Sequence, residues 1–452
     1  GAGQLLRLPD YSLESGINPG FGRMLPFWMI GNHFGKRLPD KSSLFLSAVS
    51  LAAEHDTSRT VDFSYGVQVN SRFDGRKFFF LEEAYLDFFY RKIFISCGRQ
   101  ERFDRYTDHP LSTGSIMKSR NAPPLPEILI GTDGFMKVPF TKGYVEIKGL
   151  LSHGWFGKDS YVANQYLHHK NLYIRLGGTL PVNVSAGLEH YAIWGGVSPE
   201  PEYGELPKGW GTYGKVFFAS RGSTDDPSTP KNEALNKLGN HLGSRNYRID
   251  LKTKKHILSI YYQTIFEDFS GFRKLFMPDG LWGIVVESVN DKGILTNFLF
   301  EHFESTCQSG GIIHSKDKTS YVDDYFNHYI YKSGWTYHGY TIGNPLITSP
   351  VIAQSDTIAI INNRVSANHF GVNGFMSQKI KYIFILTFIK NLGTYPFPYN
   401  TPQRSASALI TVSGYPGFLK GMEASVGLGF DIGDAYGNNA GISLTIIKRG
   451  SL

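Results

Sequence analysis

Histidine, serine and aspartate side chains of the kind that hydrolases use are scattered through this chain. The candidates are His190, His241, Asp268, Ser270 and Asp279. A catalytic triad is recognised by hydrogen-bonded geometry in space, and the chain holds no Gly-x-Ser-x-Gly turn of the type that presents a nucleophilic serine. We therefore interpret these residues as polar groups that satisfy loop backbone. We expect no enzyme and no catalytic residue.

Metal chemistry has little support in the spacing of the ligand-type residues. His168 and His169 are adjacent, and neighbouring residues of a strand point to opposite faces. No second cluster has the spacing of a zinc site. The pair Asp323 and Asp324 leaves calcium open, because calcium prefers oxygen-rich loops. We expect no metal and no cofactor.

Aromatic and cationic residues in or beside the long loops fit carbohydrate recognition better. Aromatic rings stack on sugar rings, and Arg or Lys pairs with carboxylate or phosphate. The candidate carbohydrate contacts are Trp194, Trp210, Trp282, Trp335, Arg120, Lys208, Arg245 and Lys332. Together they predict a weak, multivalent glycan-binding surface.

The elements that must position these residues are strands, and the last two are the clearest. From 422 to 432 every second residue is apolar, and residues 440 to 446 repeat the pattern after a turn rich in glycine and asparagine. A period of two indicates a strand with one apolar and one polar face. Similar alternation recurs from Ser43–Ala52, the first expected strand, onward, and we expect about sixteen to eighteen strands.

Charged residues occupy the polar faces of several strands, including Arg175, Arg248, Lys252 and Asp431. Because burial of an unpaired charge is costly, they predict either a wet lumen or the outer face of a soluble sandwich. Aromatic runs at strand ends, such as 78–80, 88–90 and 395–399, are typical of the girdles of outer-membrane barrels. A closed barrel also leaves no strand edge in the bilayer. We therefore predict an all-β fold, a large closed antiparallel transmembrane β-barrel.

The totals agree with this class. The chain has 452 residues, 50 glycines and only 2 cysteines, Cys97 and Cys307. No apolar stretch is long enough for a transmembrane helix. The formal charge of +7 favours anionic partners, but its cations form no run, so we expect no nucleic acid.

Two regions and three long loops follow from the pattern. Residues 1–40 do not alternate and contain an apolar knot at 26–30, which predicts a plug-like or periplasmic segment with short helices. Residues 41–452 would form the barrel. Proline, glycine and tyrosine place its long loops at about 102–142, 195–245 and 305–350.

An ordered set of short motifs resembles the capsule-assembly Wzi family, in the variety found in the Bacteroidota. The motifs lie at 111–115, 119–124, 168–173, 187–190, 194–196, 239–244, 267–271, 278–283, 308–310, 333–335 and 343–345. They contain Asn121, His190, Asn240, His241, Asp268 and Asp279. The resemblance implies an outer-membrane barrel of about eighteen strands in a Gram-negative bacterium. It also implies a role in attaching or organising capsular polysaccharide.

Four functions stay open at this point. The first is a non-enzymatic barrel that binds capsular or another anionic surface polysaccharide, with salt-sensitive affinity. The second is a channel or transport component, in which Arg175, Arg248 and Lys252 set selectivity. The third is a hydrolase at the barrel mouth, and the fourth is a structural subunit of a larger envelope assembly. Outer-membrane lipid or lipopolysaccharide and envelope proteins are the further expected partners.

Overall fold

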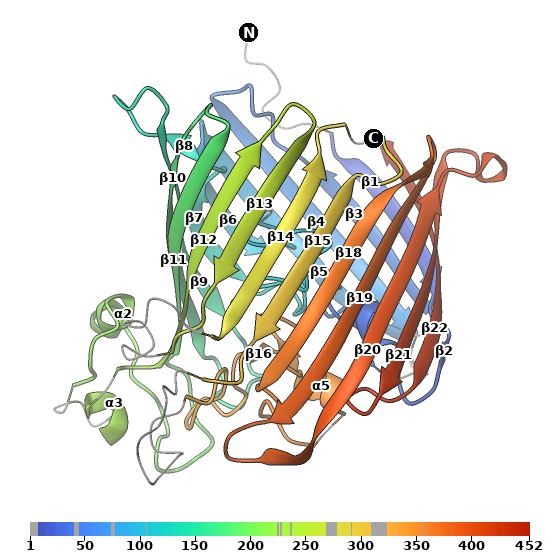
Figure 1. Cartoon of the computed structure of the whole chain (residues 1–452). Coiled ribbons are helices and arrows are strands. Elements are labelled where there is room, and N and C mark those ends of the chain that lie inside the picture. The colour runs from blue at the N-terminus through green and yellow to red at the C-terminus, as the bar shows by residue number, and fades with distance from the viewer. Residues whose placement is uncertain are drawn as a thin grey trace.

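The computed structural model describes residues 8–39, 45–73, 77–104, 106–223, 226, 228–235, 237–267, 278–290, 292–308, 323–354 and 356–452. Within these residues, eighteen long antiparallel strands pair edge to edge in one closed ring (Figure 1). In chain order they are β1 (Asp10–Ile17), β3 (Phe45–Ala53), β4 (Val61–Phe73), β5 (Lys77–Tyr90), β6 (Ile93–Arg99), β7 (Glu127–Thr132), β9 (Val145–Trp155), β10 (Tyr166–Leu176), β11 (Val182–Trp194), β12 (Asn240–Lys252), β13 (His256–Gln263), β14 (Gly280–Ser288), β15 (Asn297–Glu304), β18 (Val365–Ser377), β19 (Ile380–Gly393), β20 (Pro398–Gly414), β21 (Met422–Gly433) and β22 (Asn439–Ser451). The predicted closed barrel is confirmed.

The remaining elements are short. The strands β2 (Gly20–Phe21) and β8 (Met136–Lys137) lengthen neighbouring ladders, and β16 (Thr336–Tyr337) pairs with β17 (Tyr340–Thr341) in a separate hairpin. The helices are α1 (Phe27–Ile30), α2 (Trp210–Phe217), α3 (Lys231–Leu235), α5 (Pro350–Ala353) and the 3-10 turn η1 (Gly417–Leu419). None of the described helices is long and apolar enough to span a membrane.

The ring closes between the two ends of the chain. Strand β1 pairs with β3 on one side and with β22 on the other, with Asp10 opposite Ser451. The expected division at residue 40 is therefore wrong, because residues 10–17 form a wall strand, and Ser43–Ala52 belongs to the second strand rather than the first. Sequence analysis missed β1 because it is short and lies between Pro9 and Pro19.

The two ends of the barrel differ in loop length. At the end that carries both termini, the connections are short, as between β5 and β6 or between β18 and β19 (Figure 1). At the opposite end, called the long-loop end below, the long connections run over 18–44, 100–126, 195–239 and 305–364. Two expected loop boundaries were wrong: 127–132 is the wall strand β7, and β12 begins at Asn240.

The alternation in the last hairpin places apolar residues outside the ring. In β21 the side chains of Val426, Leu428 and Phe430 are exposed, whereas Asp431 is buried on the inner side. Outward tyrosine and tryptophan side chains follow one another on β12, β13 and β14, where Trp282 stacks on Tyr262 at 3.8 Å between ring centroids. This is the outer surface of a barrel that faces hydrocarbon with an aromatic girdle.

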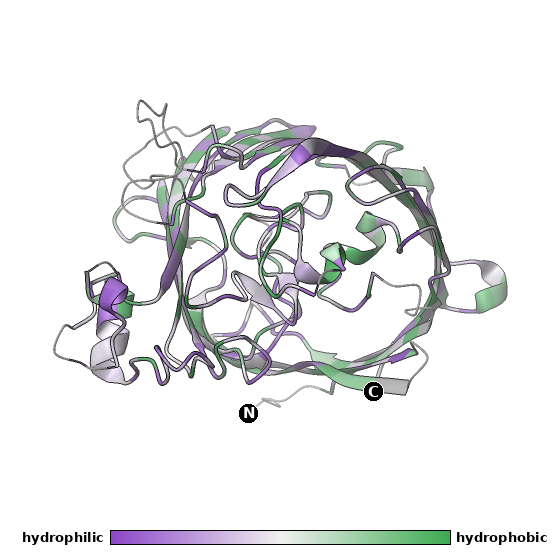
Figure 2. Ribbon diagram, turned by 90° about the horizontal axis from the view of Figure 1, so that it is seen from below, coloured by the Kyte–Doolittle hydropathy of each residue, from purple (hydrophilic) through white to green (hydrophobic). Residues whose placement is uncertain are grey.

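The long-loop half of the lumen holds a packed core instead of the expected wet interior. We call the described residues of the inserted segments 18–39, 100–126 and 323–364 the plug; Figure 2 shows ribbon lying inside the ring. Apolar residues of the plug, including Met24, Leu25 and the knot at 26–30, pack with inward residues of the wall such as Leu281 and Phe303. Two wall glycines, Gly429 and Gly441, make room for α1: a β-carbon at either would come within 2.9 Å and 2.6 Å of the Met29 sulfur.

Buried carboxylates on the wall hold the plug in place. Glu301 on β15, which is 0% exposed, accepts hydrogen bonds from the Ser112 hydroxyl at 2.6 Å and from the Thr113 backbone N–H at 2.7 Å. Asp431 on β21 accepts one from the Phe27 backbone N–H at 2.9 Å, at the start of α1. Hydrogen bonds to an ionised acceptor are strong, and they satisfy charges that would otherwise be costly to bury.

The cations that the channel hypothesis required are paired. Arg175 lies 2.7 Å from Glu146, and Arg248 lies 2.7 Å from Asp250 while also donating to the Tyr106 carbonyl at 3.1 Å. Lys252 donates to the Asn183 side-chain oxygen at 2.6 Å. These contacts link polar residues of the wall to one another, and Arg248 also links the wall to the plug.

We expect Glu301→Gln to loosen the plug. The amide keeps one acceptor but presents N–H groups toward the Thr113 N–H, so the free energy of unfolding should fall by about 1–3 kcal/mol. Ion conductance in planar bilayers should rise relative to that of the native barrel. Glu423→Gln at the opposite end, where the carboxylate makes an exposed pair with Arg449, is the control. Equal conductance of the two variants would contradict the anchoring role.

Candidate functional site

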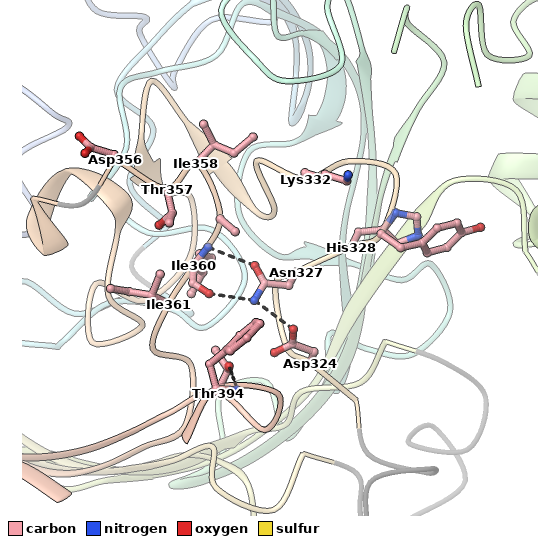
Figure 3. Close-up of a pocket in the computed structure, with 13 residues that line it drawn as sticks. Asp324, Asn327, His328, Lys332, Asp356, Thr357, Ile358, Ile360, Ile361 and Thr394 are labelled. Atoms are coloured by element: carbon pink, nitrogen blue, oxygen red, sulfur yellow. Dashed lines mark hydrogen bonds between the residues drawn. The ribbon is translucent and has the colours of Figure 1, made fainter. Parts of the chain in front are cut away.

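A hollow of about 940 Å³ opens at the long-loop end, between the plug and a turn of the wall (Figure 3). Its lining combines aromatic, aliphatic and hydrogen-bonding side chains. The lining residues are Asp324, Asn327, His328, Tyr329, Lys332, Asp356, Thr357, Ile358, Ala359, Ile360, Ile361, Thr394 and Phe397. Two plug stretches, 324–332 and 356–361, and the turn between β19 and β20 supply them.

Two aromatic rings of the hollow are accessible. Tyr329 is 42% exposed and Phe397 is 80% exposed. Tyr329 is supported from behind by the His328 ring at 4.6 Å and faces Tyr203 of the 195–239 connection at 6.4 Å. Exposed rings held by their neighbours form platforms on which a sugar ring can stack at little entropic cost.

Asn327 fastens the two plug stretches of the hollow together. Its amide nitrogen donates to the Ile360 carbonyl at 2.9 Å and to Asp324 at 3.2 Å, and its oxygen accepts from the Ile360 N–H at 3.1 Å. Asp324 also accepts from Asn363 at 2.6 Å. The floor of the hollow is thus preorganised, with its hydrogen-bonding groups fixed before a ligand arrives.

The cation of the hollow is neutralised within the protein. The Lys332 ammonium forms an ion pair with Glu200 and lies 5.5 Å from the centre of the Tyr161 ring. The Tyr161 hydroxyl donates to the same carboxylate at 2.6 Å. With Asp324 and Asp356 also in the lining, the hollow carries no excess of positive charge.

His328 is a neutral acceptor in the wall of the hollow. Its Nδ1 accepts hydrogen bonds from the backbone N–H groups of Ile330 at 3.2 Å and Tyr331 at 3.3 Å. Burial lowers the pKa of His328 to about 4, because the charged imidazolium would lose its hydration. At neutral pH the imidazole therefore holds the turn that carries Tyr329 and Lys332.

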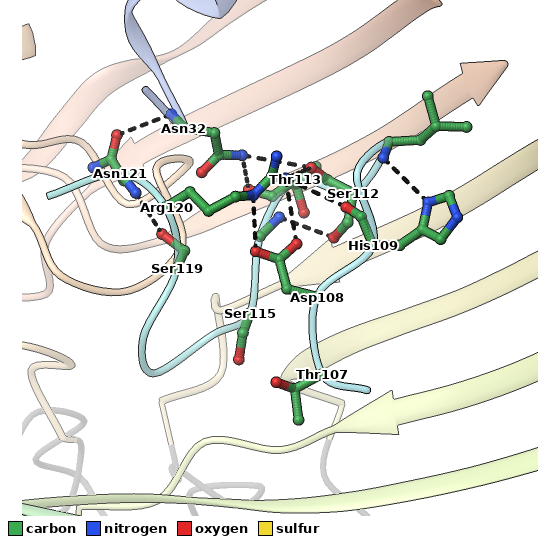
Figure 4. Close-up of polar contacts among 12 residues, drawn as sticks. Asn32, Thr107, Asp108, His109, Ser112, Thr113, Ser115, Ser119, Arg120 and Asn121 are labelled. Carbon is green, nitrogen blue, oxygen red and sulfur yellow. Dashed lines mark hydrogen bonds and ion pairs between the residues drawn. The ribbon is translucent and has the colours of Figure 1, made fainter. Parts of the chain in front are cut away.

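Two of the predicted carbohydrate contacts lie inside the barrel, and that assignment was wrong for them. Trp335 is fully buried and donates its indole N–H to the Met117 carbonyl at 2.6 Å. Arg120 pairs with Asp108 at 3.1 Å within a network of plug loops (Figure 4). These two side chains stabilise the plug. Arg245, on β12, is 7% exposed but has the outward parity of Leu188, its partner on β11.

The other predicted contacts lie in four different places. Lys332 borders the hollow, and Lys208 is exposed beside Glu205. Trp282 faces outward on β14 with the girdle. Trp194 and Trp210 line a second cavity, of about 670 Å³, on the outside of the wall beneath α2, which we call the outer groove.

The residues singled out in the family motifs are mostly structural. Asn121 donates to the Thr341 carbonyl at 2.9 Å, and Asn240 is buried at the start of β12. His190 and His241 hydrogen-bond to each other at 2.9 Å on the outer wall. Asp268 and Ser270 lie outside the described residues.

Asp279 anchors the connection that follows β15. Its carboxylate accepts the backbone N–H groups of Cys307 at 2.9 Å and Gln308 at 2.5 Å, and burial raises the pKa of Asp279 to about 6. Cys307 and Cys97 are not joined in a disulfide. Asp279 therefore satisfies backbone N–H groups of a loop, which is the role that the sequence predicts for it.

Sequence reasoning missed the aromatic residues that the hollow exposes. Tyr329 belongs to the tyrosine-rich stretch of the predicted loop 305–350, and this richness was the signal available. Phe397 was assigned to the membrane girdle, but it occupies the turn between β19 and β20. Side-chain type alone did not separate a ring in the girdle from a ring at the mouth.

The family is decided by a profile match. The family model of the capsule assembly protein Wzi matches residues 29–348. The chain belongs to the Wzi family. No curated protein sequence matches the chain.

Solved structures give the same fold at low identity. The first is Wzi of Escherichia coli, described as an outer-membrane, carbohydrate-binding β-barrel involved in group 1 capsule assembly. It is 14% identical, with 98% of this chain and 85% of that chain covered and a TM-score of 0.63. Pseudomonas aeruginosa OccK3 is 10% identical, with 99% and 97% covered and a TM-score of 0.50.

A barrel of this family lies in the outer membrane of a Gram-negative bacterium. In such barrels the short turns face the periplasm and the long loops face outward. By this rule the hollow, the plug and the short helices α1, α2, α3 and α5 belong to the outer side. The sequence predicts short helical segments on the periplasmic side, whereas these helices lie at the long-loop end.

Acid should open the turn that His328 holds. Because the pKa of His328 is lowered in the folded chain, its contribution to stability is complete above about pH 6.5, its unfolded value, and is lost as the pH falls toward 4. Hydrogen exchange of residues 323–332, corrected for intrinsic rates, should lose protection over this range. His328→Asn, which keeps an acceptor that does not titrate, should remove the pH dependence. The same acid response in this variant would contradict the mechanism.

Proposed function

We propose that this Wzi-family barrel is a non-enzymatic capsule-assembly protein that binds surface polysaccharide in the hollow at its long-loop end. The observation that carries the proposal is the open lining of exposed rings and fixed hydrogen-bonding groups, set above a packed plug. Capsular polysaccharide is the natural ligand for such a surface in this family, and the Escherichia coli relative is described as carbohydrate-binding.

The lining favours stacking and hydrogen bonding over charge pairing. Tyr329 and Phe397 offer rings, while Asn327 and Thr394 carry polar groups near them. The lysine is already paired with Glu200. We therefore propose a polysaccharide of low or mixed charge, instead of the anionic polymer that the composition suggests. Salt should then weaken binding only slightly, since screening acts on exposed charges.

The channel alternative has less support. The buried cluster of plug and wall residues occupies the lumen at the long-loop end, and the inward cations are paired. A role as a subunit of a larger envelope assembly is compatible with glycan binding, and co-purification would test it.

Removing the exposed rings should weaken polysaccharide binding. Tyr329→Ala and Phe397→Ala should each raise the Kd about two- to tenfold, because a ring contact is worth about 0.5–1.5 kcal/mol. The measurement is binding of capsular polysaccharide from the source cells to the detergent-purified barrel. Phe418→Ala is the matched control, because Phe418 is equally exposed at the opposite end. Unchanged affinity in both ring variants would refute the assignment of the hollow.

A further inference from the structure

The outer groove lies on the bilayer side of the wall, beneath a helix that the ring does not contain. Figures 1 and 2 show α2 and α3 outside the barrel at the long-loop end. Strands β6, β7, β9, β10 and β11 form the wall of the groove, and α2 covers it. The lining residues are Ile95, Ile128, Leu129, Ile130, Leu151, Ser152, His153, Trp155, Tyr166, Trp194, Gly209, Trp210 and Tyr213.

The lining is hydrocarbon-like and continuous with the lipid-facing surface. Ile128 is 50% exposed, and Ile95 and Ile130 beside it are similarly open. No lining residue is an aspartate, glutamate, lysine or arginine. The volume of about 670 Å³ falls within the range of about 300–1,000 Å³ for small-molecule sites.

Helix α2 is fastened over the groove by specific contacts. The Tyr213 hydroxyl lies 3.2 Å from Nδ1 of His168, and Val216 is buried against Ala192 and Trp194. The Lys170 ammonium donates to the Phe217 carbonyl at the last turn. Trp210, one turn before Tyr213 on the same face of the helix, also lines the groove and is 89% exposed. The groove therefore has a fixed roof with an aromatic rim that suits the interface between lipid and water.

The lining contains a polar group that makes no hydrogen bond within the described residues. The Trp194 indole N–H is buried and has no acceptor among the described residues. Buried indole N–H groups usually find one. The ester carbonyl of a membrane lipid is an acceptor that would stand at this depth, where acyl chains meet the headgroup region.

The groove and the hollow are joined by one short segment. Residue 194 and residue 210 both line the groove, while between them Glu200 pairs with Lys332 of the hollow and Tyr203 packs near Tyr329. The polypeptide thus runs from the outer groove to the hollow, the proposed sugar-binding site, and back to the outer groove within this segment.

We propose that the outer groove holds an acyl chain of an outer-leaflet glycolipid, with its sugar headgroup directed toward the long-loop end. The position of the acyl chain follows from the groove alone. The direction of the headgroup rests on the proposed function. The occupant is a chain embedded in the bilayer, because the groove continues the surface that already contacts lipid.

Tryptophan fluorescence can test this occupant with the full-length barrel in bilayers. The fluorescence of Trp194 is obtained as the difference between the native barrel and the Trp194→Phe variant. In phosphatidylcholine with brominated acyl chains, this fluorescence should be quenched. Trp282→Phe isolates a girdle tryptophan in the same way and serves as the reference for bulk lipid. Added deep-rough lipopolysaccharide, whose chains carry no bromine, should restore the Trp194 signal at a low mole fraction and leave the Trp282 signal quenched.

A variant pair sharpens the result. Tyr213→Ala removes a roof contact and should weaken the lipopolysaccharide effect about tenfold, which corresponds to about two lost methylene contacts. Leu172→Ala, an apolar truncation on the lipid-facing wall outside the groove, should leave it unchanged. If brominated chains leave Trp194 unquenched, the groove holds no acyl chain and the proposal is overturned.

If unbrominated phosphatidylcholine restores the Trp194 signal as well as lipopolysaccharide does, the groove accepts any chain and the glycolipid assignment fails. Binding of lipid-free polysaccharide to the Tyr329→Ala and Phe397→Ala variants is scored separately. A failure of the hollow therefore remains distinguishable from a failure of the groove.

Discussion

The interaction on which the rest of the structure depends is the hydrogen bond from plug backbone to buried wall carboxylate. Glu301 and Asp431 each hold a different plug segment through its N–H groups, and Asp279 does the same for the connection after β15. Because such carboxylates are costly to bury without donors, removing the plug would leave the wall with unsatisfied charge. Wall and plug therefore specify each other's position.

This coupling explains why the hollow is preorganised although it is made of loops. The segments that carry Asn327 and Tyr329 continue directly into plug residues fixed against the wall. Loops normally gain precision only from a rigid scaffold beneath them. Here the scaffold is the filled lumen, and the packed plug supports the proposed sugar-binding surface.

Much of the fold could be predicted from alternation, and much of the site could not. The hairpin at 422–447 showed its outward face plainly, because bilayer and lumen select opposite side-chain types. Strand β1 escaped notice because its apolar residues are few. The aromatic and cationic contacts were chosen by residue type, whereas their role depends on which side they face: Trp282 shares the outward parity of Ile284, and Trp335 turns into the plug. Strand parity can be read from a sequence, but the path of a long loop into a lumen cannot.

The seam between β1 and β22 also constrains how the molecule is made. It joins residues far apart in the chain; the Ser451 hydroxyl donates to Asp10 across a sequence separation of 441. Contacts this distant carry a large loop-closure entropy, which local pairing of the intervening hairpins reduces only gradually. Until the seam forms, the sheet has two open edges that can pair with another chain. The barrel is therefore complete only when β1 pairs with β22. Until that step, the open edges of the sheet can pair with another chain.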